Sequence, residues 1–369
     1  MSKNKTLNDA ARAKKDEFYT QLGDIERELQ HYRKHFDGKV VLCNCDDPFE
    51  SQFFYYFAMN FNFLKLKKLI VTSYTGSPVV GNLFEVVKDT RKPAYKVEIN
   101  GIDKDPLDWH AVTEMMNELK AALDGNSSAT VNANTLALLN GERGKYSAGD
   151  FRSKECVELL RQADIVVTNP PFSLFREYVK LLVDNDKKFL VIGNINAITY
   201  KEIFPLIMQN KLWLGYGMGR AISGFIVPDD YELYGSEARI NERGQRIVAT
   251  NQCLWMTNLE HDKRNRPYDL TGTYTPEDYP RYDNYDAIEV SKTGDIPADY
   301  FGVMGVPITF LDKYCPNQFE ILGHTSSNDL SPAVEALRTD PTNRNRGIIN
   351  GQQKYDRILI RRRQDDFAK

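Results

Sequence analysis

The stretch VVTNPPFSLF, residues 166–175, holds the features from which the fold is predicted. The β-branched residues of 164–168 predict a buried strand, and the apolar spacing of 173–185 predicts a helix directly after it. Between the two lies a turn with two prolines, from Asn169 to Phe172. A strand, a turn and a helix in this order form one unit of an α/β sheet, and ligands bind beyond the carboxyl ends of its parallel strands.

The residues of this turn suit the binding of a planar amine. The side-chain carbonyl of Asn169 and the backbone carbonyl of Pro170 are two hydrogen-bond acceptors. Pro171 stiffens the chain, and Phe172 supplies a flat apolar ring. Two fixed acceptors above a ring would bind both N–H bonds of an amine such as the adenine amino group, while the ring stacks on the base. The alternative is a structural junction between a strand and a helix.

Apolar segments elsewhere in the chain repeat the alternation of strand and helix. Further strands are predicted at 39–43 and 67–74, both buried, at 187–194, and at 211–217 and 252–260 as closing strands. Helices are predicted at 24–36, at 48–61 with Pro48 in the first turn, at 106–123, at 153–163 with Ser153 as N-cap, and at 200–209. These elements together predict an α/β fold with a Rossmann-like, mostly parallel sheet.

Residues 83–148 interrupt this alternation and are interpreted as an insertion. Within them, 94–101 predicts an exposed strand, and 125–135 has the composition of a loop. After about residue 262 the chain becomes rich in Tyr, Pro and Asp, which predicts an irregular connection. We therefore expect a first domain of residues 1–262 and a C-terminal region of residues 263–369.

Length, charge and hydropathy exclude several classes of protein. The 369 residues suffice for one large domain with an appendage. A net charge of −3 gives no general attraction to nucleic acid, so any surface for it must be local. No run of about 18 apolar residues predicts a membrane span, and the N-terminus lacks the apolar core of a signal peptide.

The five cysteines form no recognisable metal or disulfide pattern. Their odd number, without a signal peptide, favours reduced thiols in a cytoplasmic protein. Cys43 and Cys45 form a C-x-C pair, but no second pair or nearby histidine completes a zinc site. We therefore expect no metal.

The NPPF turn resembles the catalytic motif of amino-methyltransferases that use S-adenosylmethionine. A larger pattern resembles the EcoRI-type adenine-specific DNA methyltransferases, through DEFYTQLGDIERELQHY (16–32), GKVVLCNCDDP (38–48), TNPPF (168–172), MGVPITFLDKYCPNQFEILG (304–323) and YDRILIRR (355–362). These segments extend over nearly the whole chain. Their order resembles the gamma arrangement of such enzymes, in which the target-recognition region is C-terminal.

The resemblance implies a site-specific DNA adenine N6-methyltransferase that acts on an adenine flipped out of double-stranded DNA. Its catalytic residues would be Asn169, Pro170, Pro171 and Phe172. Its cofactor would be S-adenosyl-L-methionine, and Phe172 would offset part of the cost of base flipping by stacking on the base. The enzyme would act as a monomer in restriction-modification or in phage or plasmid protection, with any cognate endonuclease acting separately.

The resemblance also implies a cofactor loop after the strand at 39–43. Such loops usually contain glycine because their backbone approaches the ligand closely, whereas CNCDDP (43–48) has none. The candidate cofactor ligands in this loop are Asn44, Cys45, Asp46 and Asp47. Asp46 is favoured for the cationic amino group of the cofactor. The alternative is that both aspartates cap the following helix.

Two further segments are implied as parts of the same site. Phe18, Tyr19 and Thr20 would close over the cofactor; the alternative is a helix entry whose aromatic residues pack on the core. The second strand ends without the acidic residue that usually contacts the ribose, so Ser73 or Tyr74 would take this role.

The segment SAGDF (147–151) is implied as the adenine end of the cofactor site. Asp150 would accept the amino group of the cofactor adenine, and Phe151 would flank the ring. The alternative is an Asp-led turn before the helix that begins at Ser153.

Basic residues cluster locally and predict contacts with DNA phosphates. The C-terminal cluster contains Arg344, Arg346, Lys354, Arg357, Arg361, Arg362 and Arg363. A glycine- and charge-rich loop contributes Arg220, Arg239, Arg243 and Arg246, and the N-terminal arm contributes Lys3, Lys5, Arg12, Lys14 and Lys15. The alternative for the C-terminal cluster is a solvated terminal strand.

The sequence also allows alternative functions. NPPF chemistry also serves amino groups of RNA bases and of protein glutamine side chains. A non-catalytic DNA-binding protein on a decayed methyltransferase fold should have lost part of the turn, yet all four positions are present. A nicotinamide-dependent oxidoreductase would require G-x-G-x-x-G after the first strand, and that pattern is absent there.

Overall fold

The computed structural model describes residues 19–74, 93–102, 107–218, 221–227, 238–241, 244–248, 252–326, 329, 331–340, 342–343 and 345–364. Predictions for Phe18, Arg220, Arg243, Arg344 and the basic residues of the N-terminal arm lie outside the described residues. The chain forms two compact units, which are described separately. One comprises Met1–Tyr200 and Gly217–Leu259, and the other Lys201–Tyr216 and Glu260–Lys369.

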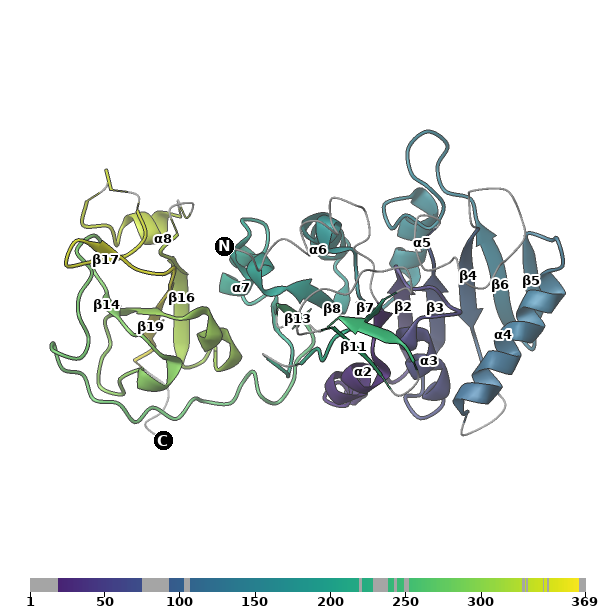
Figure 1. Cartoon of the computed structure of the whole chain (residues 1–369), viewed down its shortest axis with the longest axis horizontal. Helices are drawn as coiled ribbons and strands as arrows, with labels where there is room; N and C mark the ends of the chain where they lie inside the picture. Colours follow the sequence, from purple (N-terminus) through teal and green to yellow (C-terminus); the bar gives the residue numbers. More distant parts are fainter. Residues whose placement is uncertain are drawn as a thin grey trace. The chain divides into compact units, whose positions relative to one another are not determined.

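Four parallel strands form the centre of a large sheet in the first unit (Figure 1). They are β3 (Lys68–Thr72), β2 (Val40–Asn44), β7 (Ile165–Thr168) and β8 (Lys188–Asn194), in this spatial order. Nearly all their residues are buried, as continuous apolar runs predict for strands covered on both faces. The strands predicted from the sequence at these positions are confirmed.

The strands on both sides of this centre are antiparallel to it. On one side follow β4 (Ala94–Ile99), β6 (Asn134–Leu139) and β5 (Ser128–Val131), and on the other β13 (Cys253–Thr257). The sheet is therefore mixed, and the prediction of a mostly parallel sheet is right only for its centre. An apolar strand pattern reads alike in both directions, so it does not fix the direction of a strand.

Residues predicted to form an insertion instead extend the main sheet. The strand predicted as exposed is β4, whose Ala94, Tyr95, Val97 and Ile99 are buried between β3 and β6. The predicted loop at 125–135 is wrong, because it contains β5 and the start of β6, joined by a turn in which Asn132 and Ala133 have positive φ. Ala133 is an unusual residue for such a turn, which is why its composition did not signal a hairpin.

Helices cover both faces of this sheet (Figure 1). The helices are α2 (Leu22–Leu29), α3 (Gln52–Met59), α4 (Trp109–Leu123), α5 (Lys154–Gln162) and α6 (Phe175–Asp184). Apolar residues of α2, α3 and α4 share one core with Val41 and Val167. On the opposite face α5 packs against β2 and α6 against β8.

Several helix boundaries differ from the prediction. The helix predicted at 24–36 is the shorter α2, followed by a 3-10 turn at Arg33–His35. α3 begins at Gln52 rather than at Pro48, because Ser51 is its N-cap and accepts a hydrogen bond from the Phe53 N–H at 3.1 Å. The residues before Ser51 therefore form an extended turn after β2.

A second, smaller sheet of the first unit brings the N-terminal segment to a distant part of the chain. Its strands are β1 (Tyr19–Thr20), β10 (Phe225–Val227), β12 (Arg246–Val248) and β11 (Ala238–Ile240), in this order. β1 pairs antiparallel with β10, so that Thr20 lies opposite Phe225. The side chain of Gln21 strengthens the junction by donating to Ser223 Oγ at 2.8 Å.

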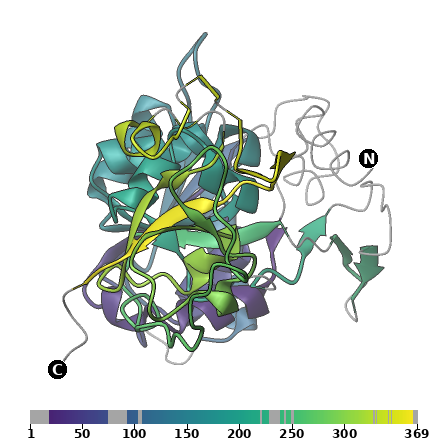
Figure 2. The same cartoon turned by 90° about the vertical axis from the view of Figure 1, so that its left-hand side faces the viewer.

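The second unit is built on a four-stranded sheet (Figure 2). Its strands are β14 (Ile288–Glu289), β15 (Val303–Val306), β19 (Ile358–Arg362) and β16 (Phe319–His324), in this order. The unit also contains α7 (Phe204–Met208), β9 (Trp213–Leu214), α8 (Pro332–Glu335) and the hairpin of β17 (Ile348–Ile349) and β18 (Gln352–Gln353). Further 3-10 turns occur at Phe172–Leu174 and Ile195–Thr199 in the first unit, and at Thr293–Asp295 and Ile308–Asp312 in the second.

Two further findings concern the whole described chain. No helix in the described part has both the length and the apolar character needed to cross a membrane. All five cysteines are free, and four of them, Cys43, Cys156, Cys253 and Cys315, are buried.

Candidate active site

The carboxyl ends of three neighbouring parallel strands place polar residues at one edge of the main sheet. Asn44 ends β2 and is paired in register with Thr72 at the end of β3. Thr168 ends β7, which runs parallel to β2 on its other side. Asn169, the first residue of the NPPF turn, therefore projects from the same edge as the predicted cofactor loop.

The hydroxyl of Thr168 connects this loop to the NPPF turn. It lies within hydrogen-bond distance of the backbone carbonyl of Asn44 and of the Asp46 carboxylate. The Tyr178 hydroxyl on α6 donates to the side-chain oxygen of Asn44. Burial raises the pKa of Tyr178 well above its ordinary value, so this group stays a neutral donor. These hydrogen bonds hold the ends of β2 and β7 in a fixed position relative to each other.

The two aspartates of the loop are buried and hydrogen-bonded. Asp46 accepts from Ser51 Oγ at 2.8 Å, and its own N–H donates to the Thr72 carbonyl at 3.0 Å. Asp47 accepts from the Phe49 N–H at 2.8 Å, and burial raises the pKa of Asp47. The alternative in which both aspartates cap the next helix is wrong, because Ser51 is its N-cap and Asp46 holds Ser51 in place.

The loop makes a left-handed turn although it contains no glycine. Cys45 has φ 70°, a conformation that costs a residue with a Cβ roughly 1–2 kcal/mol. This residue is half-buried between Asn44 and Asp46. The left-handed turn that glycine usually permits is therefore present at Cys45, and a search for a glycine-rich pattern does not find it.

The segment around Asp150 packs on the end of β3 through Gly149. Gly149 has φ +79°, and a Cβ on it would lie 1.8 Å from the Ser73 carbonyl oxygen. Phe151 is buried, with its ring 5.0 Å from that of Tyr178 in an edge-on arrangement. The sequence analysis missed Gly149, although its position directly before Asp150 was a signal for a turn.

Asp150 is held by its own neighbour, Arg152. Both carboxylate oxygens accept from the guanidinium, at 2.9 and 2.7 Å, and one also accepts from the Arg152 N–H at 3.0 Å. The latter bond is the Asp-led turn of the alternative interpretation, and Ser153 is confirmed as the N-cap of α5. Hydrogen bonding to Asp150 raises the pKa of Arg152 above its ordinary value. The contact of Asp150 with adenine stays a prediction.

Buried hydroxyl groups at the end of β3 and on β1 indicate whether a ligand with hydroxyl and ammonium groups fits the site. Thr20 Oγ1 and Thr72 Oγ1 are buried and have no hydrogen-bond partner in the described part of the chain. Ser73 Oγ accepts from the Tyr95 N–H at 2.8 Å and keeps its own proton for another acceptor. Buried polar atoms without partners are rare in proteins, so this set fits a polar ligand such as the implied cofactor.

The ring of the NPPF turn lies against the smaller sheet. Pro171 precedes the 3-10 turn in which Phe172 stands, and the Phe172 side chain is half-buried. Its centroid lies 6.0 Å from that of Phe225 on β10, with 60° between the ring planes. Since β10 pairs with β1, the structure brings Phe172 and the segment Tyr19–Thr20 to one side of the site.

Most of the arginines predicted to contact DNA take part in interactions within the protein. Arg357 donates from two nitrogens to Glu289, at 2.9 and 2.6 Å, and this pair is largely shielded from solvent. Arg362 donates to the Ala298 carbonyl and lies over the ring of Phe301. Their contact with phosphate stays a prediction, but it would require these internal interactions to break.

The remaining described arginines are more exposed. Arg361 forms an ion pair of 2.8 Å with Glu320, and Arg346 one of 3.0 Å with Asp356. Two others donate to backbone carbonyls: Arg363 to Pro316 at 2.9 Å and Arg239 to Ser223 at 3.5 Å. Exposed pairs of this kind contribute little stability, so their arginines can exchange a carboxylate for a phosphate at small cost.

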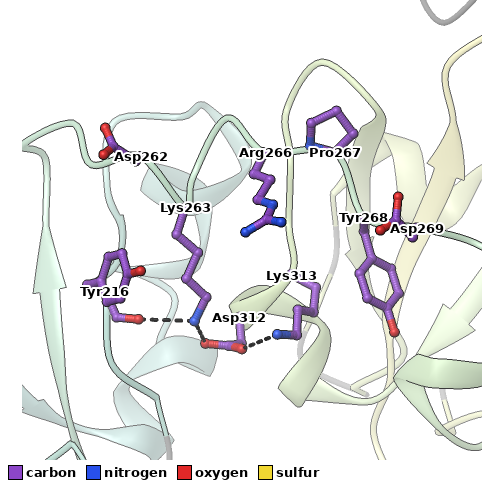
Figure 3. A pocket seen from close by; sticks show the side chains of 9 residues that line it. All are labelled: Tyr216, Asp262, Lys263, Arg266, Pro267, Tyr268, Asp269, Asp312 and Lys313. Atoms are coloured by element: carbon purple, nitrogen blue, oxygen red, sulfur yellow. Dashed lines mark hydrogen bonds and ion pairs between the residues drawn. The ribbon is translucent and has the colours of Figure 1, made fainter.

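The second unit has a pocket of about 490 Å³ with three basic side chains (Figure 3). Lys263 donates to the Tyr216 carbonyl at 3.0 Å and to Asp312, and Lys313 lies 3.3 Å from the other oxygen of Asp312. The exposed guanidinium of Arg266 points into the same space. The sequence analysis missed this pocket, although DKRNRP (262–267) was a visible basic run.

Comparison with known proteins provides a family for this arrangement. The family model described as adenine-specific methyltransferase EcoRI matches residues 6–363. The chain is 47% identical to the Type II methyltransferase M.EcoRI of Escherichia coli over 97% of this chain and 96% of that protein. It is 36% identical to M.MgeORF184P of Mycoplasma genitalium and 33% identical to M.MpnI of Mycoplasma pneumoniae, both Type II methyltransferases, over 97% of this chain and at least 98% of each relative. No solved structure matches.

Proposed function

The chain belongs to the family of the adenine-specific methyltransferase EcoRI and is an adenine-specific DNA methyltransferase; from this premise we propose which residues carry the reaction and what they bind. The proposed reaction transfers a methyl group from S-adenosyl-L-methionine to N6 of an adenine flipped out of duplex DNA, and it releases S-adenosyl-L-homocysteine and one proton from N6. The observation that carries this proposal is the connection of the NPPF turn to the Asn44–Asp47 loop through the Thr168 hydroxyl.

The NPPF turn would bind and orient the target amine. The side-chain carbonyl of Asn169 and the backbone carbonyl of Pro170 accept its two N–H bonds. This draws the nitrogen lone pair out of conjugation with the ring, so that the neutral amine attacks first and loses its proton afterwards. Phe172 stacks on the base and stabilises it outside the helix. Because the hydrogen bonds strengthen as charge develops on the nitrogen, they act mainly in the transition state.

The loop after β2 and the segment at Gly149 would hold the cofactor, which supplies an electrophilic methyl group when bound. Asp46 is buried beside Thr168 and would attract the cationic amino group. Ser73 has a proton to donate toward the ribose, and Thr72 adds a second buried hydroxyl there. Asp150 and Phe151 would contact the adenine end, with Arg152 holding the Asp150 carboxylate in orientation. We also infer that the sheet is of the Rossmann-like methyltransferase type.

The second unit would be the target-recognition region, with duplex DNA as partner. Its pocket is lined by three basic and three acidic side chains (Figure 3). Asp312 pairs with both lysines, whereas Arg266 forms no ion pair in the described part of the chain. A backbone phosphate would therefore be attracted by Arg266 and Lys313. Arg346 and Arg361 are second candidates because their ion pairs are exposed, whereas Arg357 has a structural role in its buried pair with Glu289.

A DNA substrate and five free cysteines favour the cytoplasm as the location of the enzyme. We propose that it acts as a monomer and protects its recognition sequence in a restriction-modification system. A cognate endonuclease would act separately, because methylation requires no contact between the two enzymes.

The proposed function is tested with Asn169→Ala. Loss of one of two acceptors aligned with the transition state should slow methylation of duplex DNA about 10²–10³-fold. Cofactor affinity, measured by calorimetry, should be unchanged. Asn185→Ala serves as the matched control, because Asn185 lies at the far end of α6. Near-normal turnover of Asn169→Ala would contradict the proposal, and so would parent enzyme that methylates RNA or protein in preference to duplex DNA.

A further inference from the structure

We propose that the hairpin of β17 and β18 reads base edges of the DNA target, with Gln353 as the residue that distinguishes one base pair. The proposal rests on the function proposed above, because it takes duplex DNA as the substrate. A two-stranded β-ribbon fits the major groove of B-DNA, where each base pair presents its own pattern of donors and acceptors. The proposal assigns a specificity residue to the second unit.

The hairpin has a tight and defined geometry. Ile348 pairs with Gln353 and Ile349 with Gln352, in an antiparallel register. The turn between them consists of Asn350 and Gly351, with φ of 51° and 72°. Two successive residues with positive φ are typical of the turn that follows the natural twist of paired strands. The backbone at the tip therefore has one preferred conformation.

Side chains of a neighbouring segment hold the tip in place. The carboxylate of Asp283 accepts from the N–H groups of Asn350 at 3.3 Å and Gly351 at 2.8 Å. Asn284 accepts from the Ile348 N–H at 2.8 Å. Ile349 is buried in an apolar cluster that includes the fully buried Tyr285. These contacts order the hairpin before any ligand is present, which lowers the entropy cost of binding.

The two faces of the hairpin carry different side chains. Neighbouring residues of a strand point to opposite faces, and residues opposite one another in a pair share a face. Gln352 therefore shares a face with buried Ile349, and Gln353 lies on the other face, called the outer face, opposite half-buried Ile348. Both glutamines are exposed. Tyr355 follows two residues after the end of β18 and is 80% exposed. In the described part of the chain, Gln353 and Tyr355 have no side-chain hydrogen bond or ion pair.

The chemistry of the outer face suits bases rather than phosphates. A glutamine amide can donate to N7 of adenine and accept from its N6 amino group in a bidentate pair, and an aromatic ring can contact a thymine methyl group. The tip itself, from Asn350 to Gln353, carries no charge. Phosphate contacts require cations, and these lie beside the hairpin in Arg346 and Lys354. The uncharged tip would thus contact bases, while Arg346 and Lys354 beside it would contact phosphates.

The test uses the full-length enzyme and Gln353→Ala, with Gln352→Ala as the matched control on the opposite face. The methylated sequence is first identified by sequencing modified adenines in DNA from cells that express the parent. The ratio of kcat/KM for this sequence to kcat/KM for duplexes with one base pair changed is then measured. In Gln353→Ala this ratio should fall about 5- to 150-fold at one position, with cofactor affinity unchanged. Gln352→Ala should retain the ratios of the parent.

Three outcomes would overturn the proposal. The first is a Gln353→Ala enzyme with the kcat/KM ratios of the parent. The second is an equal fall of the ratio in Gln352→Ala, and the third is a fall of the same size at every position of the recognition sequence. Gln353→Glu keeps the shape of the side chain and provides a second variant if Gln353→Ala does not fold. Its carboxylate only accepts hydrogen bonds, so preference at the affected position should shift toward cytosine, and an unchanged preference contradicts the proposal. A parent enzyme that methylates no duplex DNA would overturn the proposed function as well.

Discussion

Gly149 lies in such close contact with Ser73 that a Cβ on Gly149 would be 1.8 Å from the Ser73 carbonyl oxygen. No side chain can be accommodated at that distance, so the two backbones must separate if Gly149 is replaced. Asp150 and Phe151 follow directly and are buried beside the end of β3. The contact therefore decides where the predicted adenine end of the cofactor site lies.

We expect Gly149→Ala to lower both the free energy of unfolding and the affinity for S-adenosylmethionine. Gly125→Ala is the matched control, because Gly125 has the same φ of +79° but nothing within 4 Å of an added Cβ. The free energy of unfolding of the control should fall by about 1 kcal/mol, because alanine is strained in the left-handed conformation. Gly149→Ala should lose about 1–3 kcal/mol more through overpacking. Urea unfolding and calorimetry measure the two effects, and equal losses in both variants would contradict the account.

Phe172 should matter after base flipping rather than during DNA binding. Phe172→Ala removes the ring that stacks on the extruded base, so single-turnover methylation should slow by about 1–3 kcal/mol, or 5- to 150-fold. A mismatch opposite the target adenine lowers the cost of extrusion and should restore part of the rate. Phe172→Tyr keeps the stacking face and most of the activity. If Phe172→Ala flips 2-aminopurine and methylates as fast as the parent, the ring serves only to pack on Phe225.

The pocket of the second unit should contribute to the salt dependence of DNA binding. If Arg266 and Lys313 contact phosphates, their joint replacement by alanine should flatten the slope of log K against log salt by up to about 1.8 units, near 0.9 per contact. All DNA sequences should be affected alike. Lys65 and Lys67, which precede β3 at the amino edge of the main sheet, provide a control with the same change of charge. A slope equal to that of this control would assign the pocket another role.

Glu50 should make the stability of the protein depend on pH. Burial, together with the charge of Asp47, raises the pKa of Glu50 to about 6 from an ordinary value of 4.5. Between these two values the folded state binds more protons than the unfolded state, so stability should fall as pH rises from about 4.5 to 6. The effect should be about 1 kcal/mol or less, because Glu50 is only half-buried and solvent screens its charge.

Glu50→Gln should remove this fall, while Glu118→Gln on an exposed position of α4 should retain it. Free energies of unfolding measured by urea between pH 4 and 7 provide the test. A parallel pH dependence in the parent and in Glu50→Gln would show that other groups cause it.

The order of elements and the position of the reactive turn were predictable from local patterns. The strand at 164–168, the turn Asn169–Phe172 and the following helix occur as predicted, and so do the buried strands β2, β3 and β8. Ser153 was predictable as an N-cap for the same reason, because a hydroxyl before a helix satisfies a nearby N–H group. These features depend on residues close together in the chain, and their periodicity and capping chemistry are visible in any single sequence.

Three features depended on contacts between distant residues and appeared only in the tertiary structure. The antiparallel direction of β4 and β13 was not predictable, because a buried strand has the same pattern in either direction. The pairing of Tyr19–Thr20 with β10 joins segments about two hundred residues apart, and no local pattern selects such a partner. The buried ion pair of Arg357 with Glu289 was not predictable either, because nothing in the local sequence distinguishes Arg357 from the other arginines of the C-terminal cluster. The sequence by itself thus determined which local elements form and where the amine-binding turn lies. Tertiary packing decided the direction of the strands, their pairing partners and which arginines are free of buried ion pairs. The reason is that the free energy of burying a side chain depends on the whole fold.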